Sequence, residues 1–161
     1  MGATVARLGC GVVLMHMRGR PEEWRNLGPV DDIVALVARE LDKWGENAMQ
    51  NGIGRTRMVM DPGFGFGKNF EQNYPLLARL EELHALGYPL LAGTSKKSFV
   101  GRALRGDGKD AAVDQRIFGT VATEVLAIVK GVHVIRTHEV RASLDAARVT
   151  DAILATAVDE R

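Results

Sequence analysis

The sequence predicts an α/β fold in which four parallel strands each precede a helix. Short apolar runs alternate with segments of helical periodicity, and glycine or Asn-Gly ends most of these segments. Such alternation with short connections requires parallel pairing through right-handed crossovers. Two architectures accept four units of this kind, an open doubly wound sheet and half of an eight-stranded barrel. No linker-like or low-complexity stretch divides residues 1–161, so we expect a single domain.

The expected elements follow directly from these patterns. Strands are expected at residues 10–17, 58–60, 88–92 and 132–135. Helices are expected at residues 31–51, 76–86, 117–129 and 140–154, and residues 3–9 indicate the end of a further helix with a glycine stop. A short apolar piece at 99–104 and an exposed, mobile loop at 105–113 precede the third helix of the set. Cys10 is expected to be a buried thiol in the first strand.

Composition narrows the class of partner. The chain has 161 residues, 46% of them apolar, which suits a globular domain with a real core. With 21 basic and 20 acidic residues its formal charge is +1, so we expect neither nucleic acid nor a membrane surface as partner, and a small molecule instead. One cysteine allows no disulfide framework, and no signal peptide or membrane span is evident. A cytoplasmic protein is therefore expected.

Distinctive loops follow each expected strand, where both architectures place function. Asp61 ends the second strand, and Pro62-Gly63 turns the chain sharply after it. A carboxylate in this position can accept two parallel hydrogen bonds from a flat, amidine-like edge. The alternative is that Asp61 only caps the turn.

The glycine-rich run after Asp61 differs from known phosphate loops. A nucleotide P-loop needs glycine where Pro62 stands and serine or threonine where Asn69 stands, and the dinucleotide fingerprint also fails. We therefore expect a flexible loop that presents Phe64, Phe66 and the ammonium of Lys68 for stacking on an aromatic substrate. Either phenylalanine could instead anchor the loop to the core.

The loops after the third and fourth strands carry positive charge. Lys97 can meet a ring carbonyl or an anion, while Ser95 can orient a ligand or cap the next helical turn. The alternative is that Lys96 and Lys97 form a solvated pair. Arg136 and His138 lie two residues apart in extended chain, so they share a face and could clamp a diphosphate.

Other candidate residues have weaker patterns. Met15 ends the first strand, where methionine is more often core than ligand contact. His84 and His133 have no Cys, Asp or Glu at metal-ligand spacing, so no protein-held metal is expected. No Ser-His-Asp arrangement is evident either.

Four segments together resemble the dihydropteroate synthases along essentially the whole chain: VVLMHMRG, VMDPGFGFGKN, PLLAGTSKKSFVG and VIRTHEV. The resemblance implies a TIM-type (β/α)8 barrel, of which this chain matches strands 5–8 with their helices. It also implies a transferase of folate biosynthesis. Such enzymes condense 6-hydroxymethyl-7,8-dihydropterin diphosphate with 4-aminobenzoate to 7,8-dihydropteroate and pyrophosphate, and are sulfonamide targets.

The resemblance also implies roles for particular residues. Asp61 and Lys97 would bind the pterin ring, Arg136 would stack on it, and Met15 would form an apolar wall. The residues implied for binding substrate are Met15, Asp61, Gly65, Phe66, Ser95, Lys97, Arg136 and His138, of which Lys97, Arg136 and His138 are the catalytic candidates. Phe66 and Ser95 would lie towards 4-aminobenzoate, and Arg136 and His138 would also face the diphosphate. Mg²⁺ would be held through that diphosphate and a loop of the barrel half that this chain does not match.

Three hypotheses stay open at this point. The first is a dihydropteroate synthase represented by its C-terminal half, weakly active or inactive alone. The second is a pterin-binding methyltransferase, which shares the barrel and an aspartate-based pterin pocket. The third is a non-catalytic half-barrel that pairs with itself or with a partner half, since unpaired strand edges favour association. A homodimer or association with the other barrel half is expected.

Overall fold

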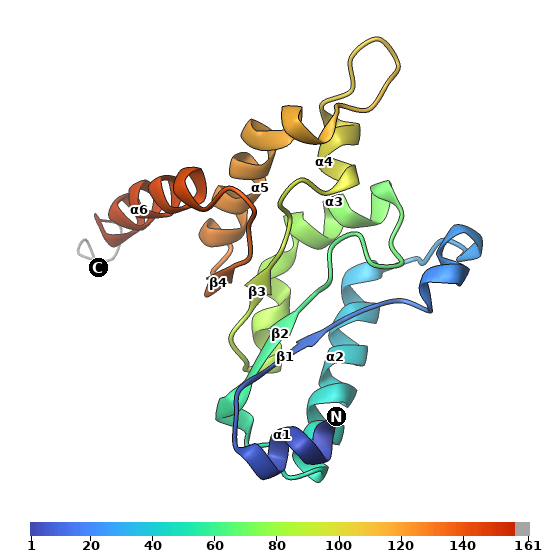
Figure 1. Ribbon diagram of the computed structural model, residues 1–161, viewed down its shortest axis with the longest axis vertical. Coiled ribbons are helices and arrows are strands. Elements are labelled where there is room, and N and C mark those ends of the chain that lie inside the picture. The colour runs from blue at the N-terminus through green and yellow to red at the C-terminus, as the bar shows by residue number, and fades with distance from the viewer. Residues whose placement is uncertain (157–161) are drawn as a thin grey trace.

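The computed structural model describes residues 1–156 as a row of short strands with helices beside it (Figure 1). The helices and strands are, in chain order, α1 (Gly2–Leu8), β1 (Val12–Met15), α2 (Ile33–Gln50), β2 (Met58–Asp61), α3 (Phe70–Ala78), β3 (Leu91–Ala92), α4 (Ser98–Ala103), α5 (Ile117–Val129), β4 (Val134–Ile135) and α6 (Val140–Thr156). Short 3₁₀ helices occupy Pro21–Asn26, Arg55–Arg57, Leu80–Leu86 and Val113–Arg116. The predicted α/β class is confirmed.

The described strands are parallel and neighbour one another in chain order. β1 pairs with β2 in a register that sets Met15 opposite Asp61. A bridge between Met60 and Leu90 joins β2 to the start of β3, and β3 pairs with β4. Strand order does not reverse within this row, and parallel neighbours place their carboxyl ends at one edge. The loops that follow the four strands therefore lie together.

Helix ends follow capping signals in the sequence. Asp32 precedes α2, and its carboxylate accepts the backbone N–H groups of Val34 and Ala35. Gly52, just beyond the end of α2, has a positive φ of 86°. Gly9 ends α1 in the left-handed conformation, with φ 64°. The predicted ends of both helices are confirmed.

The predicted helix at residues 76–86 has different bounds in the structure. The α-helix begins earlier, at Phe70, because Asn69 and Gln72 form a capping box. The leucine-rich segment Leu80–Leu86 is instead a 3₁₀ helix, which ends at Gly87. Leucine spacing thus located the buried face but not the type of helix.

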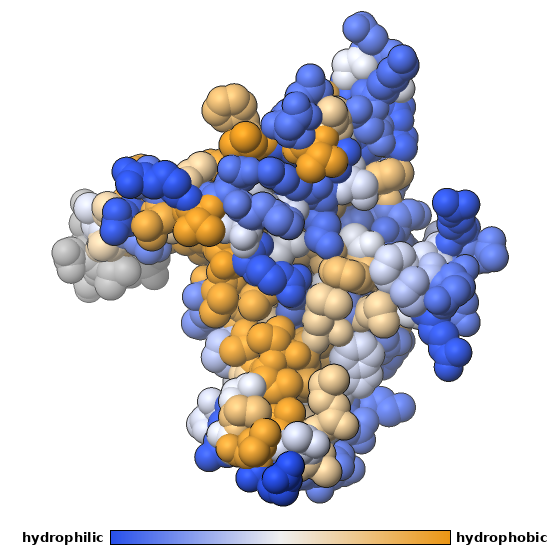
Figure 2. All heavy atoms as spheres, viewed as in Figure 1, coloured by the Kyte–Doolittle hydropathy of each residue, from blue (hydrophilic) through white to orange (hydrophobic). Residues whose placement is uncertain are grey.

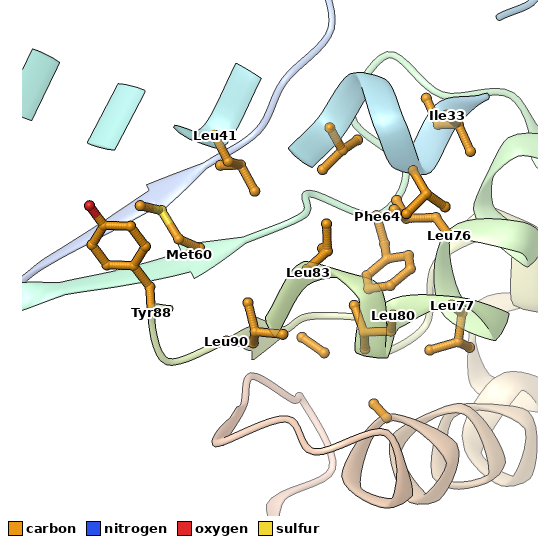
Figure 3. Close-up of a cluster of buried hydrophobic side chains, with 14 of the residues drawn as sticks. Ile33, Leu41, Met60, Phe64, Leu76, Leu77, Leu80, Leu83, Tyr88 and Leu90 are labelled. Carbon is orange, nitrogen blue, oxygen red and sulfur yellow. The ribbon is translucent and has the colours of Figure 1, made fainter. Parts of the chain in front are cut away.

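The apolar core lies between the strands and the helical layer. Figure 3 shows Leu41 from α2, Met60 from β2 and Leu80 and Leu83 from the 3₁₀ helix gathered in one cluster. All four side chains are fully buried. Burial of each such side chain contributes about 1.5–3 kcal/mol. This core fixes β2 and β3, whose ends carry the loops of interest.

Cys10 lies outside this core. β1 begins at Val12, and Cys10 is exposed in the connection between the stop at Gly9 and the strand. The prediction of a buried strand thiol is wrong, because the apolar run in the sequence begins before the strand does.

The apolar piece predicted before the exposed loop forms helix α4. Residues 103–110 are exposed, as expected for that loop. Asp110 pairs with Arg102 and Arg105, at 2.9 and 3.1 Å, and ties the end of the loop to α4.

The strand face that points away from the helical layer is partly apolar and open. Successive strand residues point to opposite faces, so Val13 and Val134 point away from the core. They are 45% and 41% exposed. Figure 2 shows hydrophobic residues gathered over the strands on the viewed face. No element of residues 1–156 covers Val13 or Val134.

Candidate active site

Asp61 lies among the loops at the carboxyl edge of the strand row. It is the last residue of β2, and its side chain is fully buried. One carboxylate oxygen, Oδ1, accepts the backbone N–H of Gly63 at 2.7 Å. The other, Oδ2, lies 3.1 Å from Arg136 Nη2 without hydrogen-bond geometry, and has no hydrogen-bond partner among the described residues. A buried carboxylate oxygen in this state can still accept a bond from a ligand.

The electrostatic environment of Asp61 is balanced between two effects. Burial raises the pKa of its carboxyl group above the usual value. The Gly63 N–H and the nearby charges of Arg136, Lys68 and Lys97 act in the opposite direction. The ionised form of Asp61 therefore depends on these surrounding donors and cations.

Lys97 and Phe66 approach each other across the loop ends. Lys97 precedes α4, and its Nζ lies 4.0 Å from the centroid of the Phe66 ring. Gly65 lies beside the lysine, since a Cβ there would be in ordinary van der Waals contact with Lys97 Cδ, at 3.4 Å. Burial lowers the pKa of Lys97, as does the charge of Arg136, while Asp61 raises it. Lys97 therefore contacts the Phe66 ring and is near enough to Asp61 for that carboxylate to act on its pKa.

Ser95 and His138 form a second contact between the loops after β3 and β4. The Ser95 hydroxyl oxygen accepts the backbone N–H of His138 at 3.1 Å and lies 3.0 Å from His138 Nδ1. Ser95 is buried, whereas His138 is exposed. The hydroxyl therefore holds the loop after β4 in position. The imidazole is left accessible.

A cavity of about 250 Å³ joins these groups, lined by Phe66, Gly93, Ser95, Lys97, Arg136, Thr137 and His138. The Arg136 guanidinium packs directly on Gly93, since a Cβ on Gly93 would lie 2.7 Å from Arg136 Nη2. The same Nη2 is 3.9 Å from Met15 Sδ. All eight residues predicted for the site thus lie at one edge of the strand row.

A larger apolar pocket lies elsewhere. It has a volume of about 420 Å³ and lies between α3, α4 and α5, where Tyr74, Phe99 and Leu126 contribute to its walls. Its lining contains no charged side chain. Binding sites combine apolar walls with a few convergent polar groups, which favours the smaller cavity beside Asp61.

Two groups of the glycine-rich loop face inwards, contrary to the sequence prediction. Phe64 is 1% exposed, and its ring lies 6.0 Å from that of Phe99 (Figure 3 shows Phe64 within the core). Lys68 is buried and donates to backbone carbonyls, so its ammonium is not presented to a ligand. Only Phe66 remains at the cavity, and the other ring anchors the loop.

Sequence reasoning missed Trp24. It belongs to the 3₁₀ helix that follows β1, and its indole packs edge-on against Phe66, with centroids 5.8 Å apart. Phe66 therefore has an aromatic neighbour and also contacts the Lys97 ammonium. The sequence feature that could have indicated Trp24 was its place as an aromatic residue in the loop after a predicted strand.

Sequence reasoning also gave no role to His16. It is fully buried, stacks on Trp44 at 5.5 Å and donates from Nε2 to Glu40 at 3.0 Å. Burial lowers the pKa of His16 to about 3, and the charges of Lys68 and Arg18 act in the same direction.

Comparison with known proteins follows this geometry. A family model described as pterin binding enzyme matches residues 1–138 of the chain. The chain belongs to the pterin-binding enzyme family. Its relatives in this family include the dihydropteroate synthase of Escherichia coli strain K12, 39% identical over 156 residues, which cover 97% of this chain and 54% of the relative. The dihydropteroate synthase of Mycobacterium leprae is 40% identical over 159 residues, covering 96% and 55%.

Solved structures similar to this chain also belong to dihydropteroate synthases. Yersinia pestis dihydropteroate synthase in a sulfonamide drug complex matches with a TM-score of 0.89 and 37% identity, over 96% of this chain and 54% of that chain. Xanthomonas albilineans dihydropteroate synthase in complex with 7,8-dihydropteroate matches with a TM-score of 0.84 and 40% identity, over 96% and 54%. The chain spans about half the length of the relatives it matches.

Two further observations concern the described residues. Within residues 1–156, no three His, Cys, Asp or Glu side chains converge as a metal site. In the same residues, no helix is both long enough and apolar enough to cross a bilayer.

Proposed function

We propose that this chain provides strands 5–8 of a dihydropteroate synthase barrel, with residues 1–161 as one domain of TIM-type half-barrel architecture. The unreversed order of the parallel strands supports a barrel over a doubly wound sheet, whose strand order reverses. The match to about half of each relative also supports it.

The proposed reaction joins 6-hydroxymethyl-7,8-dihydropterin diphosphate to 4-aminobenzoate. The bond from the pterin methylene carbon to the diphosphate oxygen breaks, and diphosphate leaves with the electron pair. The amine of 4-aminobenzoate then bonds to that carbon and loses a proton, which gives 7,8-dihydropteroate. Positive charge on the methylene and negative charge on the leaving group are what the site has to stabilise.

The observation that carries this proposal is the buried, under-bonded Asp61 carboxylate beside three convergent cationic or basic side chains. Asp61 is assigned to the N–H edge of the pterin and Lys97 to its ring carbonyl. Arg136 stacks on the ring and, with His138, faces the diphosphate. These are the groups that the proposed substrate requires.

The remaining assignments concern the second substrate and the wall of the site. Phe66 and Ser95, which line the cavity, are assigned to 4-aminobenzoate by the resemblance to dihydropteroate synthases, with Gly65 beside Phe66. Met15, next to Arg136, supplies an apolar wall.

Mg²⁺ is the proposed cofactor, and its chemistry is to neutralise charge on the departing diphosphate. The lining of the cavity carries the cations Lys97 and Arg136 and no carboxylate, since Asp61 is buried against the turn. These cations suit a diphosphate rather than a metal. We therefore assign no metal ligand to the described residues, and the ion would be held through the diphosphate and groups outside them.

The open strand face supports an assembly. Val13 and Val134 expose apolar surface that the matching barrel enzymes would cover with further strand-helix units. We propose that such units, or a second copy of the chain, cover this face. We further propose that the protein works in the cytoplasm without nucleic acid or membrane partners.

Calorimetric titration with a pterin diphosphate analogue tests the pterin assignment. Asp61→Asn and Lys97→Ala should each weaken binding about 10–100-fold, because each removes a charge-assisted hydrogen bond. Asp145→Asn and Lys109→Ala, at exposed positions, are the matched controls and should bind like wild type. Unchanged affinity in both site variants, or no binding by the wild-type chain, would contradict the proposal.

A second measurement separates the family's activities. Pyrophosphate release on addition of 4-aminobenzoate identifies the proposed synthase. Methyl transfer from a folate would instead identify a pterin-binding methyltransferase, and neither activity, in a chain that self-associates, would support the non-catalytic module.

A further inference from the structure

Lys68 is a buried lysine that none of the assignments above uses. It is 7% exposed, and its Nζ donates to the backbone carbonyls of Gly63 at 2.8 Å and Phe66 at 3.2 Å. Burying a charged ammonium is costly unless it is paired and hydrogen-bonded. The cost is offset here by bonds that close the loop between two site residues.

The loop that Lys68 closes carries Asp61 at one end and Phe66 at the other. Gly63 connects them, since its N–H donates to Asp61 Oδ1 and its carbonyl accepts from Lys68. The Asp61 carboxylate and the Phe66 backbone are therefore held through one ammonium. Both of these hydrogen bonds are made by backbone atoms of Gly63.

A second residue supports the same loop from α3. Asn73 is buried, its Oδ1 accepts the N–H of Gly65 at 2.7 Å, and its Nδ2 donates to the carbonyl of Asn69 at 2.6 Å. The loop is therefore fixed on both sides. It is not the flexible segment that its glycines suggested.

Lys68 also contributes charge. Its ammonium is one of the cations that lower the pKa of Asp61 against the effect of burial. Burial lowers the pKa of Lys68 itself to about 7, opposed by the carboxylates of Asp61 and Glu40.

The other charged or titratable groups that bear on Lys68 belong to three segments. Arg18, after β1, and Lys97, at the start of α4, lower its pKa further. The charge of Lys68 also helps to lower the pKa of His16, after β1, which is neutral above about pH 3. Asp61 and Glu40 are therefore the groups that favour a charged Lys68.

We propose that Lys68 is a positioning residue for pterin recognition, which holds Asp61 and Phe66 in fixed relation through the backbone and places an ammonium near the Asp61 carboxylate. The inference rests on the proposed function, because it assigns the pterin edge to Asp61. Lys68 does not touch the substrate. Its effect reaches the ligand through Asp61 and the loop.

Lys68→Met and Lys68→Arg separate the charge from the packing. The assay is calorimetric titration of the 161-residue chain with a pterin diphosphate analogue between pH 5 and pH 9. Wild-type affinity should fall on the acid side as Asp61 becomes protonated. In Lys68→Met this fall should begin at a higher pH, because the variant lacks one of the cations that lower the pKa of Asp61. Lys68→Arg, which keeps the charge, should keep the wild-type acid limb.

Two outcomes would overturn the proposal. One is an acid limb in Lys68→Met that coincides with that of wild type, whatever the loss of affinity at other pH values, because a merely structural role would lower affinity at every pH. The other is a limb in Lys68→Arg that shifts as far as that of Lys68→Met.

A titration without ligand keeps this test separate from the proposed function. The carboxyl carbon of Asp61, followed by NMR, should titrate at higher pH in Lys68→Met than in wild type. Where that variant does not fold, the reciprocal measurement decides: Asp61→Asn should lower the pKa of the Lys68 amine, because Asp61 raises it. An unchanged Lys68 titration would overturn the coupling. Absence of pterin binding with a shifted Asp61 titration would instead contradict the proposed function alone.

Discussion

Gly63→Ala should be among the most destabilising single-methyl additions to this chain. A Cβ at position 63 would lie 1.8 Å from the carbonyl oxygen of His16, whereas real Cβ contacts stay beyond 3.0 Å. One of the two backbone segments must therefore move by more than about 1 Å. Gly63 also has a positive φ of 67°, which costs an alanine about 1–2 kcal/mol.

The displacement would also break the two hydrogen bonds that Gly63 makes. Its N–H bonds the Asp61 carboxylate at 2.7 Å and its carbonyl accepts from the Lys68 ammonium at 2.8 Å, and bonds to charged groups contribute about 1.5–3 kcal/mol each. Together with the backbone strain, we expect a loss of about 4 kcal/mol or more. That is a large part of the stability of an ordinary domain.

Urea unfolding monitored by circular dichroism measures this loss. Gly108→Ala is the matched control, because Gly108 has φ 76° but open space around its Cβ position. It should lose only the backbone strain, about 1–2 kcal/mol. If Gly63→Ala and Gly108→Ala lose equal free energy of unfolding, the reasoning from the close approach of Gly63 to the His16 carbonyl is refuted.

Two further predictions concern buried ionisable residues. The folded-state pKa of His16, about 3, lies below the unfolded value of 6.5, so its contribution to stability is fully present above pH 6.5 and is lost as pH falls towards 3. His16→Gln should therefore flatten the acid side of a plot of unfolding free energy against pH by up to about 1.4 kcal/mol per pH unit, and parallel curves would contradict this. Glu124 is 1% exposed on α5, and neither of its carboxylate oxygens has a hydrogen-bond partner in residues 1–156. Glu124→Leu should raise the free energy of unfolding by about 1–3 kcal/mol, whereas the exposed control Glu46→Leu should change it by less than about 0.5 kcal/mol, and a loss in Glu124→Leu would contradict the reasoning.

The strand ends were the part of the fold that sequence predicted best. Periodicity marked where each apolar run stops, and parallel pairing then required the following loops to meet. Asp61, Lys97 and Arg136 could be grouped in this way because each directly follows or closely succeeds a strand. The 3₁₀ form of Leu80–Leu86 could not be predicted, since leucines at helical spacing bury equally well in either helix.

Orientation within a loop was beyond sequence reasoning. Phe64 and Phe66 stand in identical glycine contexts, yet one fills the core and the other meets the cavity. Both lie between glycines of positive φ, so what separates them is tertiary contact: Phe64 packs near Phe99, whereas Phe66 meets Trp24 and Lys97. Lys68 was likewise expected to present its ammonium to a ligand, because its bonds to two carbonyls exist only once the loop has closed.

Arg136 meets Asp61 in the way that the proposed ligand would. A guanidinium and the amino-pyrimidine edge of a pterin are both flat sets of N–H donors, and Arg136 already places one nitrogen 3.1 Å from the carboxylate of Asp61. The substitute is imperfect, because the contact lacks hydrogen-bond geometry. On the proposed function, an incoming pterin would compete with the protein's own side chain. Its affinity would be the difference between a well-aligned pair of bonds and a poorly aligned ion pair, and the displaced arginine would be free to lie over the ring.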